Sequence, residues 1–192
     1  MHPRLAAIER EIREATDRLD RLVGGLDEET WATRPGAGEW SAAECVAHLN
    51  LTADGMLPGL RAGVEEAATL GGSGRYRSDP VGWLFASLVG PLPRIAGRRR
   101  GRVSTTAPFE PGPDLPMAGT VDRFRKDQAE LLRLLERADG LPLTRVKVQS
   151  PFVDRVRYNA YSTFRIIVRH EHRHLQQAEE AVARVREAKD RA

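Results

Sequence analysis

The chain contains one cysteine and few aromatic residues, and each shortage excludes a class of protein. Because Cys45 is the only cysteine, an internal disulfide framework is excluded. Proteins without disulfides are typical of a reducing compartment, so we predict a cytoplasmic protein. Aromatic residues make up 6% of the 192 residues and charged residues 30%. This balance favours long amphipathic helices over a β-sandwich.

Long apolar segments are also missing. The longest stretch without a charged side chain, residues 80–93, has fourteen residues, whereas a membrane-spanning helix needs about 20. The first fifteen residues include acidic side chains and contain no apolar segment of the kind found in a signal peptide. We therefore expect a single domain over residues 1–192 without a membrane span.

The positive charge is concentrated in one segment. Of the 30 lysine and arginine residues, five lie in residues 94–102, which contain no acid, so the rest of the chain has 25 basic against 27 acidic residues. This segment could contact nucleic acid, anchor an interfacial helix to a membrane, or form a solvated loop that attracts an anionic substrate. We favour the loop that attracts an anion, with a plain solvated loop as the next alternative. We disfavour nucleic acid, because the aromatic residues of single-strand binders are missing there.

Apolar residues spaced three and four apart predict an all-α fold, an antiparallel four-helix bundle. The predicted helices are residues 5–23, a helix from the capping box Ser41–Glu44 to residue 70, a helix capped by Thr120 that ends at residue 139, and residues 158–188. A long loop rich in proline and arginine joins the second and third helices. Residues 145–148 alternate as a strand does, but without a partner strand we predict an extended loop.

Three of the five histidines, His170, His172 and His174, lie close together near the C-terminus. On a helix His170 and His174 share one face, and His172 points to the opposite side. Two imidazoles at this spacing can bind one metal ion. Spacing alone also fits solvated or hydrogen-bonded histidines, and His48 on the second helix alone fits a core histidine.

Two motifs of the chain resemble signatures of the DinB/YfiT-like superfamily. Residues 31–49 match W-x-x-x-P followed by W-S-x-x-E-x-x-x-H-L, and residues 170–177 match H-x-x-x-H-L-x-Q. The segments APFEP and SPF also look like connecting loops of that family. The similarity extends over about residues 5–188, because the order of the helices agrees as well.

This resemblance implies a four-helix bundle in which His48, His170 and His174 bind a divalent metal ion. Three neutral imidazoles suit zinc, nickel or iron, and they leave a coordination position open to water or substrate. Glu44 and Gln177 match the motifs and are candidates for supporting the ligands, although the capping box also explains Glu44. The sequence identifies no catalytic residue.

Some relatives transfer low-molecular-weight thiols to electrophiles. The resemblance therefore implies a metal-dependent enzyme with a small-molecule substrate. Its first implied reaction is thiol S-transfer, in which the thiol is a second cofactor. A metal-dependent hydrolase is the neighbouring alternative. A non-enzymatic metal-binding or stress-response scaffold is the alternative from another class. Family members often form homodimers, but no apolar face in the sequence identifies an interface.

Overall fold

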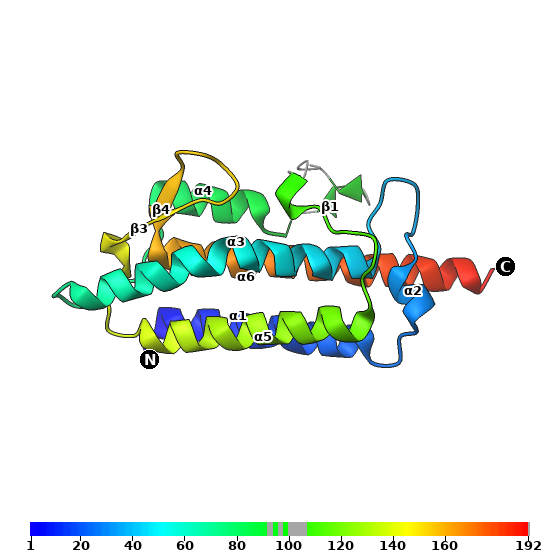
Figure 1. The fold of residues 1–192 in the computed structure, drawn as a ribbon, viewed down its shortest axis with the longest axis horizontal. Helices are drawn as coiled ribbons and strands as arrows, with labels where there is room; N and C mark the ends of the chain where they lie inside the picture. The colour runs from blue at the N-terminus through cyan, green and yellow to red at the C-terminus, as the bar shows by residue number, and fades with distance from the viewer. Residues whose placement is uncertain (92–93, 96–97, 100–106, 192) are drawn as a thin grey trace.

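The computed structural model describes residues 1–91, 94–95, 98–99 and 107–191. Helices dominate this part of the chain (Figure 1), which confirms the prediction of an all-α protein. The α-helices are α1 (Pro3–Val23), α2 (Glu28–Ala32), α3 (Ala42–Thr69), α4 (Pro80–Val89), α5 (Met117–Arg137) and α6 (Ala160–Lys189). Short 3-10 turns cover Ala107–Phe109 and Leu143–Arg145, and two antiparallel hairpins pair β1 (Arg94–Ile95) with β2 (Arg98–Arg99) and β3 (Lys147–Gln149) with β4 (Arg157–Asn159).

The four long helices begin and end where local chemistry favours it. Helix α3 starts at the predicted capping box: the Ser41 hydroxyl accepts from the Glu44 N–H at 3.2 Å, and the Glu44 carboxylate accepts from the Ser41 N–H at 2.9 Å. Helix α1 ends at Gly24, as predicted. Apolar residues of α1, α3, α5 and α6 are buried where these helices pack side by side.

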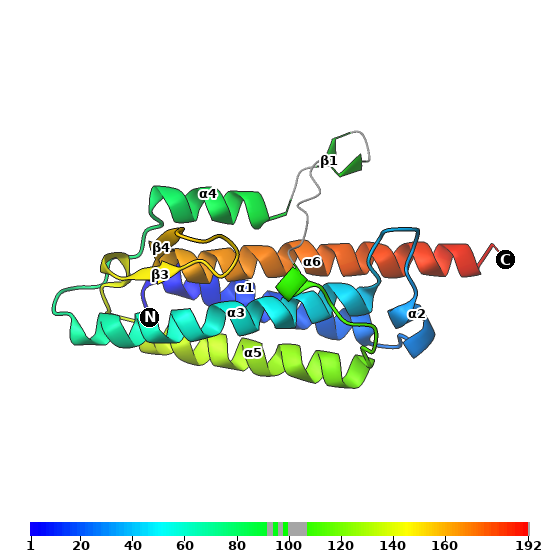
Figure 2. The ribbon, with the colours of Figure 1, turned by 45° about the horizontal axis from the view of Figure 1, so that its top comes forward.

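Contacts between the long helices give their directions, and one of them differs from the prediction. Asn50 donates to the Thr120 carbonyl and Arg61 pairs with Glu130, so α3 and α5 run parallel. Figures 1 and 2 show both helices running opposite to α1 and α6. Two helices of the predicted antiparallel bundle, α3 and α5, are therefore parallel to each other, because the chain between them, residues 70–116, is long enough to return along the molecule.

Three segments predicted as loops contain regular structure. Residues 80–89 form α4, which begins at the N-cap Asp79 and packs along α6. Glu28–Ala32 forms α2. Lys147–Gln149 is a strand, and its partner is Arg157–Asn159, which the helical pattern had assigned partly to the last helix. We had predicted a loop because no partner strand was recognised in the sequence. The partner strand, β4, lies just before α6.

The structure also bears on the predicted start of the third long helix, on residues 94–102 and on membrane spans. Helix α5 begins at Met117, three residues before Thr120, so Thr120 is not its cap and instead accepts a hydrogen bond from Asn50 through its carbonyl. The loop predicted to attract an anionic substrate, residues 94–102, lies mostly outside the described residues. Only the backbone of β1 and β2 is described in this segment. Within the described part of the chain, no helix has both the length and the apolarity needed to cross a membrane.

Asp79 joins four elements at the end of the molecule where α4 starts. One carboxylate oxygen accepts from the Gly82 N–H at 3.0 Å and from the Ser162 hydroxyl at 3.2 Å. The other accepts from the Asn159 N–H at 3.1 Å and pairs with Lys147. Burial raises the pKa of this carboxyl, but Lys147 and the hydrogen bonds lower it more, so the pKa lies below its ordinary value.

We expect Asp79→Asn to lower the free energy of unfolding by about 1–3 kcal/mol at pH 7, because it removes the ion pair with Lys147 and the oxygen that accepts from the Asn159 N–H. A carboxyl with a lowered pKa stabilises the fold above its unfolded pKa, and that stabilisation disappears as the pH falls below about 4. Urea denaturation from pH 3 to pH 7 should therefore show a difference from the wild type that shrinks in acid. The exposed Asp154 is the matched control, and Asp154→Asn should change stability by less than about 0.5 kcal/mol. Equal losses in both variants would contradict this role.

Candidate metal centre

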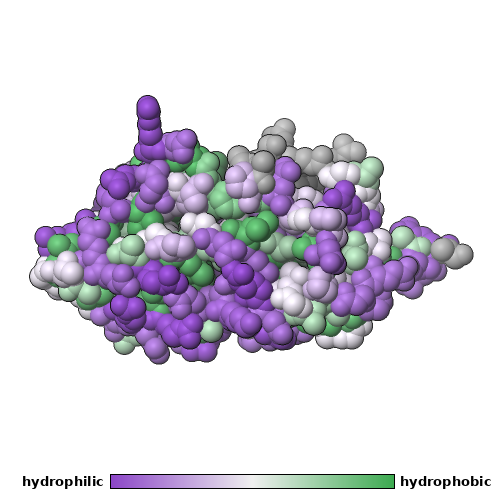
Figure 3. Space-filling view, viewed as in Figure 1, coloured by the Kyte–Doolittle hydropathy of each residue, from purple (hydrophilic) through white to green (hydrophobic). Residues whose placement is uncertain are grey.

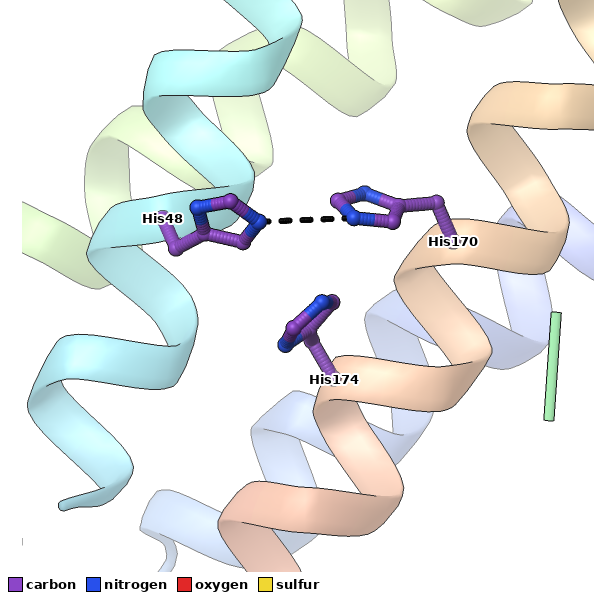
Figure 4. A group of neighbouring side chains, drawn as sticks. All are labelled: His48, His170 and His174. Carbon is purple, nitrogen blue, oxygen red and sulfur yellow. Dashed lines mark hydrogen bonds between the residues drawn. The ribbon is translucent and has the colours of Figure 1, made fainter. Parts of the chain in front are cut away.

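Three histidine rings from two helices converge on one point (Figure 4). His48 comes from α3, and His170 and His174 come from α6. The ring centroids are 5.1 Å apart for His48 and His170, 4.6 Å for His48 and His174, and 4.5 Å for the pair on α6. One possible ligand nitrogen from each ring lies within 4.8 Å of the other two. The structure thus brings together the three predicted ligands, and they could hold a metal ion.

The packing of α3 against α6 produces this convergence. The two helices run antiparallel: His48 lies against His170, and a Cβ on Gly63 would lie 3.5 Å from the Ala160 Cβ. His172 takes no part, because it faces α1, where its Nδ1 lies 3.1 Å from an Arg18 nitrogen. This placement confirms that His172 and the other two histidines of α6 lie on different faces.

A backbone carbonyl determines which nitrogen of His48 faces the other rings. The Phe109 carbonyl oxygen lies 2.8 Å from His48 Nδ1. Because a carbonyl can only accept, Nδ1 carries the proton, and Nε2 presents its lone pair. Histidines that bind metals usually donate their second ring N–H in this way.

The spacing of two nitrogens matches a metal ion directly. His48 Nε2 lies 3.3 Å from His170 Nε2. Two imidazole nitrogens bound at 2.0–2.1 Å to a tetrahedral ion are separated by about 3.3–3.4 Å. This pair could therefore bind such an ion without moving the helices.

The protonation states of the buried rings favour ligand chemistry. Burial lowers the pKa of His48, although its hydrogen bond to Phe109 opposes part of the change. Burial lowers the pKa of His170 to about 3, and the charges of His48 and Arg173 act in the same direction. Both rings are therefore neutral at pH 7, which is the form that binds metals.

Aromatic side chains surround the histidines. The Trp40 ring centroid lies 5.0 Å from that of His48 and 5.9 Å from that of His174, and the Phe152 ring lies 6.3 Å from His170. Phe109 and Phe152, from the segments APFEP and SPF, pack against each other at 4.8 Å. Trp40 belongs to the motif of residues 31–49, whereas the Phe109 carbonyl was not predicted, because a backbone group has no residue signature.

The two predicted supporting residues lie near the histidines in sequence. Glu44, one turn before His48, accepts from the Ser41 N–H and from Arg34 Nε at 2.8 Å. Burial raises the pKa of Glu44, but Arg34 and the cap lower it more, so this carboxylate is ionised and directed to Arg34. Gln177 lies partly buried on α6, three residues after His174. A supporting role for either residue stays a prediction.

Comparison with known proteins gives one match. A family model described as the DinB superfamily matches residues 11–178, from α1 to beyond His174. No curated protein matches the chain, and no solved structure does.

Gly55 gives a test of the Phe109 carbonyl. A Cβ at this position would lie 3.0 Å from Phe109 Cε1 and 3.3 Å from the Pro151 Cβ, so Gly55→Ala should displace the turn that holds the carbonyl. We expect the Kd for Zn²⁺, measured by competition with a chromophoric chelator, to rise about tenfold or more. Gly119→Ala on α5 is the control, because its nearest contact is 3.8 Å and it brings the same helix propensity. Unchanged affinity in Gly55→Ala would show that the carbonyl does not position His48 for metal binding.

Proposed function

This chain belongs to the DinB superfamily, and we propose that it is a metal-dependent enzyme in which His48, His170 and His174 bind one divalent ion. The observation that carries the proposal is the convergence of three imidazoles with the Nε2 of His48 aimed at the others. We also propose that residues 1–192 form one domain built on a four-helix bundle of the DinB type. The pairwise packing of α1, α3, α5 and α6 supports this assignment.

The chemistry of the donor set supports the choice of ion. Three neutral imidazoles suit zinc, nickel or iron. They leave a position for water or substrate and leave the charge of the ion uncompensated, so an anionic ligand such as a thiolate is favoured. When bound, the ion would act as a Lewis acid that lowers the pKa of a coordinated water or thiol.

The residues of the chain would hold the site in shape and control access to it. The Phe109 carbonyl fixes the tautomer of His48, and the rings of Trp40 and Phe152 limit the water around the histidines. His170 and His174 are only partly buried, whereas His48 is 5% exposed. A small substrate would therefore approach from the side of α6.

Thiol S-transfer in the cytoplasm is our preferred reaction, with a low-molecular-weight thiol as the second cofactor. A thiol has a pKa of about 8.5, far closer to neutrality than that of water, so it needs less help to lose its proton. The carboxylates close to the histidine ligands in sequence are engaged with protein groups and not with the metal position. Glu44 pairs with Arg34, and Glu171 accepts from Gln128 at 2.7 Å. This engagement disfavours the hydrolase alternative, which needs a proton acceptor beside the bound water.

Elemental analysis tests the metal site. Protein purified without an affinity tag should contain close to one equivalent of zinc, nickel or iron, and the His170→Ala, His174→Ala double variant should contain almost none. His172→Ala should retain the metal, because this ring faces α1. Equal metal content in the wild type and the double variant would refute the site.

Turnover separates an enzyme from a metal-binding scaffold. Wild-type protein incubated with small thiols and electrophilic acceptors should form thioether product, and the double variant should lose at least about 100-fold in rate, as expected when a Lewis acid is removed. A protein that binds metal and becomes more stable to heat, but forms no product with any thiol and acceptor, would support the scaffold instead.

A further inference from the structure

A pocket of about 590 Å³ lies where α1, α4 and α6 meet. Tyr161 of α6 lines it, and His170 follows Tyr161 by nine residues, which is half a turn away around the helix. The pocket therefore opens on the side of α6 opposite the histidine group, where α4 packs on the outside of the molecule (Figure 2). Its volume is within the range of about 300–1,000 Å³ typical of small-molecule sites.

The walls of the pocket carry an excess of positive charge. Three arginines line it, Arg4, Arg77 and Arg165, against one acid, Asp79. The acid is neutralised by Lys147, so it does not cancel the arginines. Only one of the three arginines, Arg165, forms an ion pair within the described residues, with Glu11 at 3.0 Å.

The other two arginines form no ion pair with a carboxylate within the described residues. Arg4 donates to the Tyr76 carbonyl at 2.6 Å, which orients its guanidinium but leaves its charge uncompensated. The backbone carbonyl of Arg77 accepts from the Asn159 side chain at 2.9 Å, while the Arg77 guanidinium makes no hydrogen bond or ion pair to any described residue. A guanidinium group without an acidic partner favours carboxylate and phosphate ligands, which it can bind through two hydrogen bonds.

Two aromatic residues complete the pocket. Trp83 of α4 is 65% exposed, although tryptophan is usually highly buried. Tyr161 is buried, and burial raises the pKa of its hydroxyl, although Arg165 and Arg4 oppose the change, so the hydroxyl keeps its proton and can donate. A ligand that covered the indole ring would remove this apolar surface from water.

We propose that this pocket binds a small organic anion, with its carboxylate or phosphate group on Arg4 and Arg77 and its apolar body against Trp83. The site is separate from the histidine group and does not depend on the function proposed for it. The face of the molecule in Figure 3, which is formed by other elements, is hydrophilic over most of its area with apolar patches between. Recognition at the pocket would depend on the arginines that line it and on the exposed indole together.

Tryptophan fluorescence can report on this pocket. Trp83 is 65% exposed, Trp31 is fully buried and Trp40 packs against the histidines, so a ligand at the pocket would quench mainly Trp83. We expect saturable quenching by benzoate or phenyl phosphate, and none by the neutral isostere benzamide. Inorganic phosphate, which lacks the apolar body, should bind more weakly than phenyl phosphate. Calorimetric titration gives the same affinities without the indole signal, and Trp83→Phe should abolish the quenching and weaken binding.

Matched variants separate a built site from general charge attraction. Arg77→Gln should raise the Kd for the bound anion about tenfold or more, because a charge-assisted hydrogen-bond partner is lost. Arg10→Gln removes the same charge from the exposed face of α1 and should leave the Kd unchanged. Circular dichroism would verify that both variants fold, and the guanidinium of Arg77 contacts no described residue whose loss would unfold the protein.

Several results would overturn the proposal. They are equal affinity for benzamide and benzoate, equal affinity of Arg77→Gln and the wild type, or no saturation up to about 10 mM, beyond the range of a specific site. Loss of binding in the His170→Ala, His174→Ala variant would place the anion at the histidine group and would also refute it. Binding that persists in that variant, even if it contains no metal, would support the pocket independently of the metal centre.

Discussion

The hydrogen bond between His48 Nδ1 and the Phe109 carbonyl is the interaction on which the candidate site depends. Without it, the ring of His48 could present either nitrogen to the other histidines, and a proton on Nε2 would block a metal ion. With it, one lone pair faces His170 at 3.3 Å, the separation that a tetrahedral ion requires. The bond joins a helix to a turn 61 residues away, so the tautomer of one ring depends on the long-range topology of the chain.

That topology also explains why α3 and α5 run parallel. The chain that follows α3 must return along the molecule before α5 can start, and on its way it passes over α3 as the turn Ala107–Phe109. Because Gly55 has no side chain, this turn can lie close to α3; a Cβ at Gly55 would lie 3.0 Å from the Phe109 ring. The connection between β3 and β4 brings Phe152 against Phe109 in the same region. Two connections, rather than the helices alone, therefore enclose the histidines.

The sequence predicted the parts of this arrangement that depend on local chemistry. The spacing of His170 and His174 determines a shared helix face, and Ser41 with Glu44 determines a helix start, since both patterns involve residues within one turn. The motifs of the superfamily then added His48. Helix direction, the strand pair before α6 and the Phe109 carbonyl were not predictable, because each depends on where distant segments meet. Helix α4 was missed for another reason: its sequence is apolar on almost every face, so it lacks the amphipathic period that identifies a surface helix.

Helix α6 presents different chemistry on two faces, and burial explains the division. An imidazole can lose its charge, so the partly buried His170, whose pKa burial lowers to about 3, stays neutral and able to bind a metal. A guanidinium stays charged in proteins, so Arg165 needs contact with water or an acid and lies at the molecular edge with Glu11. The same helix can therefore place neutral nitrogen donors inside the molecule and fixed positive charge at its surface. A metal ion would then bind at the neutral histidines, and the fixed charge of the arginines offers an organic anion a second place beside the same helix.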